Sequence, residues 1–176
     1  SMGRFERRLP GEGRAMLAMA GARAFLAGTS PAGVCQLYCM DVPGGKVLWR
    51  REIPQARSIT ASGAGVYVRA QRVTALDAYT GRTLWTHAAE GTGPVSVQRG
   101  MVCFVDSAGG GRLMGLEAAG GKCVWQVAGV RAFHGLSADC EVAYVREADG
   151  GLRAGRPGRA GAGRWGMQDG GIFDAR

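Results

Sequence analysis

The chain has 176 residues and a formal net charge of +8, and 31 of its residues are glycine. No apolar run reaches the length of a membrane-spanning helix, so we expect no membrane span. The basic residues are scattered along the chain and do not gather in one segment, which argues against nucleic-acid binding because its footprint is a concentrated basic patch. Such binding would also weaken steeply as salt rises.

Residues 1–13 precede the first predicted unit. Ser1, Met2 and Gly3 resemble the remnant of a cleaved expression tag, and the residues after them lack the apolar core of a signal peptide. We treat residues 1–13 as a tag remnant followed by an N-terminal segment. An alternative is that residues 3–8 form an additional outer strand of the array that follows.

Four tryptophans at near-constant spacing show that the remaining chain is an array of repeats. Steps of 36, 40 and 40 residues separate them, and the positions are Trp49, Trp85, Trp125 and Trp165. Before each of the first three, the frame is an acid, a glycine, a cation and then the tryptophan. The acids are Asp41, Asp77 and Glu117, and the glycines are Gly45, Gly81 and Gly121. Repeats of this length indicate a propeller or solenoid, in which each unit buries its apolar face on the next.

The second repeat shows how one unit is built. Short apolar runs at 57–62, 66–70, 72–77 and 82–86, separated by turn residues, predict a four-stranded antiparallel sheet. Asp77 is expected to accept backbone N–H groups of the last turn, and Gly81 to take a positive φ without strain. Trp85, on the outermost strand, is expected to lie across the gap to a neighbouring sheet. We therefore interpret these repeat positions as structural.

The sequence thus predicts an all-β chain, a β-propeller of about four four-stranded antiparallel blades. The blades are placed at about 14–53, 56–89, 94–128 and 133–176. An aromatic residue marks the second strand of each, at Phe25, Tyr67, Phe104 and Tyr144. The last blade is degenerate, because Pro157 replaces the acid and glycines interrupt its apolar pattern. Four blades would form a partial ring, a small closed ring, or half of an eight-bladed ring that a homodimer completes.

Residue types that carry chemistry are sparse. The two histidines, His87 and His134, have no spacing that suggests a metal site or a nucleophile's base. Gly109–Gly111 leads into Arg112, without the Lys-Ser/Thr of a phosphate loop. Five cysteines without a C-x-x-C pair favour a reducing compartment such as the cytoplasm. We predict no catalytic, cofactor-binding or metal-ligating residue.

The frame from Thr74 through Asp77 and Gly81 to Trp85 resembles the repeat of the pyrroloquinoline-quinone-like β-propellers, a superfamily named for the quinoprotein alcohol dehydrogenases. The resemblance covers residues 14–128 well and 129–176 poorly. The resemblance implies that eight units surround the cofactor in the quinone enzymes. There the cofactor lies near a Ca²⁺ ion, which has Asn among its ligands, and near a disulfide between adjacent cysteines. This sequence has no Asn and no adjacent cysteine pair.

Other members of the superfamily are protein-binding scaffolds, among them a lipoprotein of bacterial outer-membrane protein assembly and sensory propellers attached to bacterial kinases. The resemblance therefore implies a non-catalytic protein-interaction or sensor module without a cofactor, whose protein partner the sequence does not identify. The alternative is a fragment of a quinone-dependent dehydrogenase, which would bind pyrroloquinoline quinone in the presence of Ca²⁺.

Overall fold

A computed structural model describes residues 15–30, 33–91, 93–130, 135–138, 143–146 and 152–155. In these ranges the regular structure is β-strand, apart from one short 3₁₀ turn at Ala108–Gly110. No described helix is long and apolar enough to cross a membrane. Trp165, Pro157, His134 and residues 1–13 lie outside the described ranges.

The strands form four antiparallel sheets, each made of consecutive strands. Sheet A contains β1 (Met16–Ala20), β2 (Arg23–Thr29), β3 (Cys35–Asp41) and β4 (Val47–Ile53). Sheet B contains β5 (Ser58–Ser62), β6 (Gly65–Arg69), β7 (Arg72–Asp77) and β8 (Thr83–Ala88). Sheet C contains β9 (Val95–Gln98), β10 (Met101–Asp106), β11 (Arg112–Glu117) and β12 (Cys123–Ala128). Sheet D contains β13 (Gly135–Ala138), β14 (Ala143–Arg146) and β15 (Leu152–Gly155).

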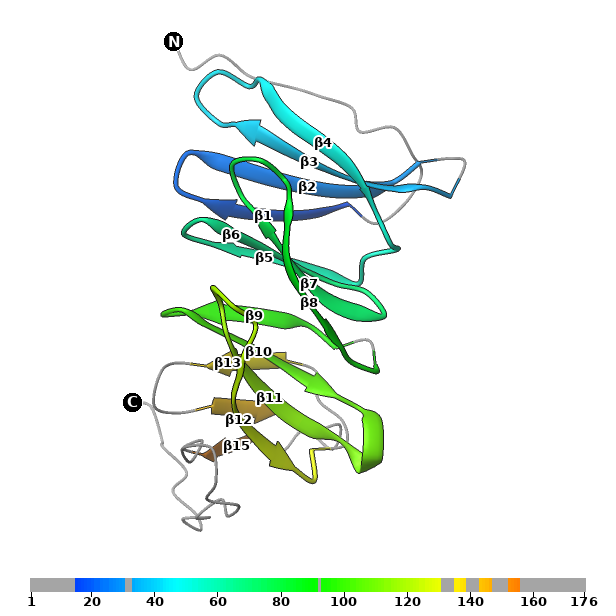
Figure 1. The fold of residues 1–176 in the computed structure, drawn as a ribbon, viewed down its shortest axis with the longest axis vertical. Coiled ribbons are helices and arrows are strands. Elements are labelled where there is room, and N and C mark those ends of the chain that lie inside the picture. Colours follow the sequence, from blue (N-terminus) through cyan, green and yellow to red (C-terminus); the bar gives the residue numbers. More distant parts are fainter. Residues whose placement is uncertain are drawn as a thin grey trace, which may run out of the picture.

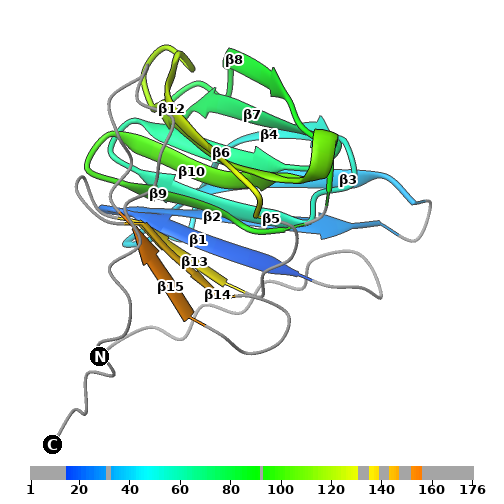
Figure 2. The same cartoon turned by 90° about the horizontal axis from the view of Figure 1, so that it is seen from below.

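The sheets are stacked in sequence order, with sheet A at one end and sheet D at the other (Figure 1). The first strands of the sheets lie along one side of the stack, where β1 contacts β5, β5 contacts β9 and β9 contacts β13 (Figure 2). The outer strands β4, β8 and β12 lie on the opposite side. This arrangement confirms the all-β propeller in the form of a partial ring, with three four-stranded antiparallel blades and three described strands in sheet D.

Apolar side chains fill the space between neighbouring sheets, because alternate residues of each strand point to opposite faces. The first cluster joins sheets A and B and includes Phe25, Leu37, Val66 and Leu76, all at most 1 % exposed. A second cluster joins sheets B and C in the same way. Each sheet therefore depends on its neighbour to bury its apolar face.

One aromatic residue is out of register with its repeat. Phe25 lies opposite Cys39, which lies opposite Trp49, and Tyr67 lies opposite Ala75 and then Trp85. In sheet C the corresponding residue is Cys103, which lies opposite Gly115 and then Trp125. Phe104 therefore points to the other face and packs in the cluster between sheets B and C. The aromatic residue marks the second strand but does not mark one face of it.

Candidate interaction site: the turn and tryptophan of each repeat

The turn between the third and fourth strands starts at the repeat's acidic residue. Asp77 Oδ1 accepts bonds from the Tyr79 and Thr80 N–H groups at 2.9 and 2.7 Å, and from the Thr80 hydroxyl at 2.9 Å. These bonds to Thr80 and Tyr79 lower the pKa of Asp77, because they favour the ionised carboxylate. Asp41 Oδ2 accepts the Gly44 N–H at 2.9 Å. Both acids thus lie in turns and accept backbone N–H groups, the role predicted for Asp77.

The glycine of the same turn adopts a left-handed backbone conformation and leaves space for a tryptophan. Gly45, Gly81 and Gly121 have φ values of 62°, 71° and 71°, a left-handed conformation that favours glycine. The missing side chain also makes room for an indole. A Cβ on Gly81 would lie 2.9 Å from Trp49, and one on Gly121 would lie 2.6 Å from Trp85. The turn of each following sheet thus forms a seat for the tryptophan of the sheet before it.

The tryptophan also donates a hydrogen bond across the gap. Trp49 Nε1 donates to the Ala78 carbonyl at 3.1 Å, and Trp85 Nε1 donates to the Ala118 carbonyl at 2.9 Å. In both cases the acceptor is the residue directly after the repeat's acid. We call this combination of indole, carbonyl and glycine the tryptophan latch. It occurs with the same geometry at the A–B and B–C junctions.

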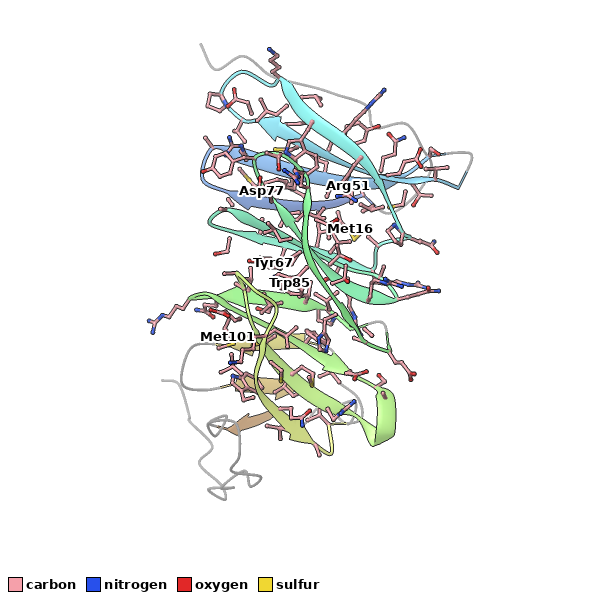
Figure 3. The ribbon with its side chains drawn as sticks, viewed as in Figure 1. Met16, Arg51, Tyr67, Asp77, Trp85 and Met101 are labelled. Atoms are coloured by element: carbon pink, nitrogen blue, oxygen red, sulfur yellow. The ribbon has the colours of Figure 1, made fainter. Side chains whose placement is uncertain are left out.

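Neighbouring side chains reinforce each latch. The centroids of the Phe25 and Trp49 rings are 6.0 Å apart, as are those of Tyr67 and Trp85. Figure 3 shows Tyr67 and Trp85 at the junction of sheets B and C. The Tyr67 hydroxyl donates to the same Ala118 carbonyl at 3.3 Å, and burial raises the pKa of that phenol.

Two arginines of sheet A add contacts that sequence reasoning missed. Arg51 Nη1 donates to the Gly81 carbonyl at 2.6 Å and to Thr83 Oγ1 at 3.3 Å. The guanidinium carbon of Arg23 lies 3.8 Å from the centroid of the Tyr79 ring, a cation–π distance. No sequence signal identifies these pairs, because the partners lie in different repeats and meet only when the sheets stack.

A buried charge lies at the junction of sheets B and C. Arg69 is 0 % exposed, and its Nη2 donates to the carbonyls of Glu90, Gly91 and Val105 at 2.5, 3.2 and 3.2 Å. Burial lowers the pKa of the guanidinium, while the charge of Asp106 opposes that shift. The position of Arg69 at the end of an apolar run carries no sequence signal for this burial.

Asp106 organises the loops around this junction. It is almost fully buried, its Oδ1 accepts the N–H groups of Glu90 and Ala108 at 2.8 and 3.1 Å, and its Oδ2 forms a 3.1 Å ion pair with Arg112 Nη2. Burial alone would raise the pKa of Asp106, but these bonds and the Arg112 charge outweigh it, so the pKa lies below its ordinary value of 3.8.

A depressed pKa makes Asp106 a source of acid-sensitive stability. Its contribution is present above the ordinary value of 3.8 and is lost as the pH falls through the lower folded-state pKa. We expect Asp106→Asn to reduce the free energy of unfolding by about 1–3 kcal/mol at pH 7, since hydrogen bonds to charged groups have this worth. Urea unfolding from pH 7 to pH 3 would check this. An Asn variant that loses as much stability on acidification as the wild type would contradict it.

The described residues contain no group of three or more His, Cys, Asp or Glu side chains placed to hold a metal ion. His87 is half-buried, and its ring centroid lies 5.7 Å from that of Phe104. Cys35, Cys39 and Cys103 are buried, and Cys123 is exposed. Burial raises the pKa values of the Cys39 and Cys123 thiols. The reactive thiolate is therefore disfavoured at both positions.

Comparisons with solved structures agree on the fold. BamB from Moraxella catarrhalis is 20% identical, with a TM-score of 0.60 over 78% of this chain and 44% of that one. A quinohemoprotein alcohol dehydrogenase from Pseudomonas putida is 16% identical, with a TM-score of 0.53 over 73% of this chain and 28% of that one. The computationally designed Ika4 protein is 16% identical, with a TM-score of 0.68 over 89% of this chain and 100% of that one.

This chain thus spans less than half the length of the BamB structure that it resembles. No curated protein matches the sequence significantly. The family model described as outer membrane protein assembly factor BamB matches two overlapping segments, residues 4–91 and 69–171. These segments together cover nearly the whole sequence and all four sheets. The chain belongs to the family of the outer membrane protein assembly factor BamB, within the pyrroloquinoline-quinone-like propellers.

Proposed function

We propose that this chain is a non-catalytic protein-interaction module of the BamB type, whose partner is a protein of outer membrane protein assembly. The observation that carries the proposal is the family match over residues 4–171. The proposal concerns the partner class, since the same fold also occurs in quinohemoprotein dehydrogenases.

The use of the repeat residues supports a binding role. Asp41 and Asp77 bind backbone N–H groups within their own turns, and Trp49 and Trp85 are engaged in latches. The most regular positions of the array thus have structural contacts, the acids within their turns and the tryptophans between blades. A row of binding surfaces on a rigid scaffold is the usual use of such repeat arrays.

The outer rim of the blades offers a surface for the partner. Leu48 and Leu84 each precede the tryptophan of their blade, lie on the outermost strands β4 and β8, and are 43% and 48% exposed. Apolar side chains repeated at one position of successive blades form a row, unlike singly scattered exposed residues. We propose that this rim row contacts the partner.

The test measures binding of the immobilised chain to purified outer membrane protein assembly proteins from a Gram-negative bacterium. We expect saturable binding that Leu84→Asp weakens about tenfold, because a charge at a contact residue must be desolvated. Gln98→Asp is the control, since Gln98 is exposed but lies at the end of the innermost strand β9, away from the outer rim. Equal weakening by both variants would contradict the rim assignment, and absence of binding would contradict the proposed function.

The alternative, a fragment of a quinone-dependent dehydrogenase, has its own test. Tryptophan fluorescence of the chain is followed while pyrroloquinoline quinone and Ca²⁺ are added. If the chain is a protein-interaction module, we expect no saturable change in its fluorescence. Saturable, Ca²⁺-dependent quenching would favour the dehydrogenase reading. The homodimer expected from the sequence stays a prediction.

A further inference from the structure

One position of the repeat frame has no side-chain contact within the blades. In sheets A and B the acids bind N–H groups of their own turns, and the glycines and tryptophans meet in the latches. The cations of the frame are Lys46, Arg82 and Lys122, which we call the cation row. All three side chains are exposed, and none forms an ion pair or a side-chain hydrogen bond with another described residue. Their charges are therefore available to another molecule.

The backbone holds the cation row in the same place on each blade. The N–H of the repeat's acid donates to the carbonyl of the cation, at 2.9 Å in sheet A and at 2.8 Å in sheets B and C. The three turns thus share one hydrogen-bonded geometry. Strands β4, β8 and β12, which follow these turns, lie on one side of the stack (Figure 2). The row therefore places one positive charge per blade along that side.

The cation row borders the rim row. Leu48 and Leu84 each lie two residues after a cation, and they are 43% and 48% exposed. In sheet C the same position is Val124, which is half-buried. A positive charge and an exposed apolar side chain therefore recur together on successive blades. This combination complements a protein segment that carries carboxylates beside apolar side chains.

We propose that the cation row and the rim row together bind an acidic, partly apolar segment of the partner protein. The inference rests on the proposed function for the role of the rim row and adds the chemistry of the segment that the rim binds. The cations pair with carboxylates of the segment, and the leucines contact its apolar side chains. Exposed ion pairs are individually weak, so the row selects an acidic segment and speeds its association more than it slows its release.

The acids of the same turns argue against a nucleic acid or a lipid surface as the occupant. Each of the turns 41–46, 77–82 and 117–122 contains one acid and one cation, so none carries a net charge. A continuous polyanion would meet the acid of every turn, whereas its binding requires a concentrated positive patch. A protein segment can place single carboxylates at the cations and apolar side chains between them.

The test measures binding of the immobilised chain to two synthetic peptides of equal length. One alternates Glu with Val, and in the other Gln replaces every Glu. We expect the Glu peptide to bind about tenfold more tightly at low salt, with a difference that shrinks as salt screens the charges. Lys46→Gln/Arg82→Gln should weaken binding of the Glu peptide about fivefold and leave that of the Gln peptide unchanged.

Arg57→Gln/Arg72→Gln is the matched control. It also removes two exposed positive charges, but from the end of sheet B that lies away from the turn carrying Arg82. This variant should therefore bind the Glu peptide as the wild type does. All four substituted side chains are exposed, so both variants should keep the wild-type circular dichroism spectrum.

Equal weakening by the two double variants would assign the effect to net charge alone and would overturn the proposal. Equal affinity for the two peptides, or binding of neither, would overturn it as well. A DNA duplex or an anionic phospholipid vesicle that binds more tightly than the Glu peptide through the cation row would assign the row to a polyanion, with the same consequence. Because the peptides contain no assembly protein, a chain that binds the Glu peptide but no assembly protein would contradict the proposed function alone.

Discussion

Replacing Trp85 by alanine is expected to lower the free energy of unfolding by about 3 kcal/mol, the lower end of the range for deleting a large core aromatic side chain, because Trp85 is partly buried. The substitution removes the 2.9 Å bond to the Ala118 carbonyl, the contact with Tyr67 and the cover over Gly121. A loss of this size is a large fraction of the stability of a domain. Urea denaturation followed by circular dichroism would measure it.

Two further variants separate the contributions to the latch. Trp85→Phe keeps an aromatic ring but loses the indole N–H. We therefore expect it to lower the free energy of unfolding by about 1 kcal/mol, the net worth of the lost hydrogen bond, which is less than the loss in the alanine variant. Leu84→Ala is the adjacent control on the exposed side of the strand and should change stability by less than about 0.5 kcal/mol. Similar losses for Trp85→Ala and Leu84→Ala would show that the latch does not hold sheets B and C together.

The second large effect is expected at the glycine that receives Trp85. Gly121→Ala forces a side chain into a left-handed conformation and places its Cβ 2.6 Å from the indole. The backbone strain costs about 1–2 kcal/mol, and displacing the packed indole adds a similar amount. We expect a total loss of about 3 kcal/mol, measured by the same denaturation experiment.

Gly100→Ala is the matched control for this prediction. Gly100 belongs to the same sheet and has a φ of 78°, but an added Cβ would meet nothing within 4 Å. It should therefore show the backbone strain alone, about 1–2 kcal/mol. Equal losses at Gly100 and Gly121 would mean that the indole moves aside freely and that the seat does not constrain it.

The sequence was informative where one repeat determines its own structure. The acid, the glycine and the tryptophan recur in a fixed frame, so the turn chemistry of Asp77 and Gly81 and the strand position of Trp85 followed from local rules. The four-stranded blades followed from the short apolar runs between turn residues. The structure adds a register shift after Cys39, Ala75 and Gly115, at the same place in each of the three sheets.

The contacts between blades could not be predicted residue by residue. Arg69 reaches the carbonyls of Glu90 and Val105, and Arg51 reaches Gly81, across gaps that only stacking creates. Phe104 was aligned by residue type with Tyr67, whereas its strand register places it on the opposite face. A shift of one residue reverses the face in a strand, and residue type alone does not reveal that shift.

The tryptophan latch uses a backbone carbonyl and a glycine on its receiving side. The side chains of Ala78 and Ala118 take no part in the hydrogen bonds that their carbonyls accept. Few side-chain identities are therefore needed to keep neighbouring blades in place, and most other positions can change as long as they stay apolar or polar. Such tolerance of sequence drift gives a physical reason why this fold persists in solved proteins that share only 16–20% of their residues with this chain.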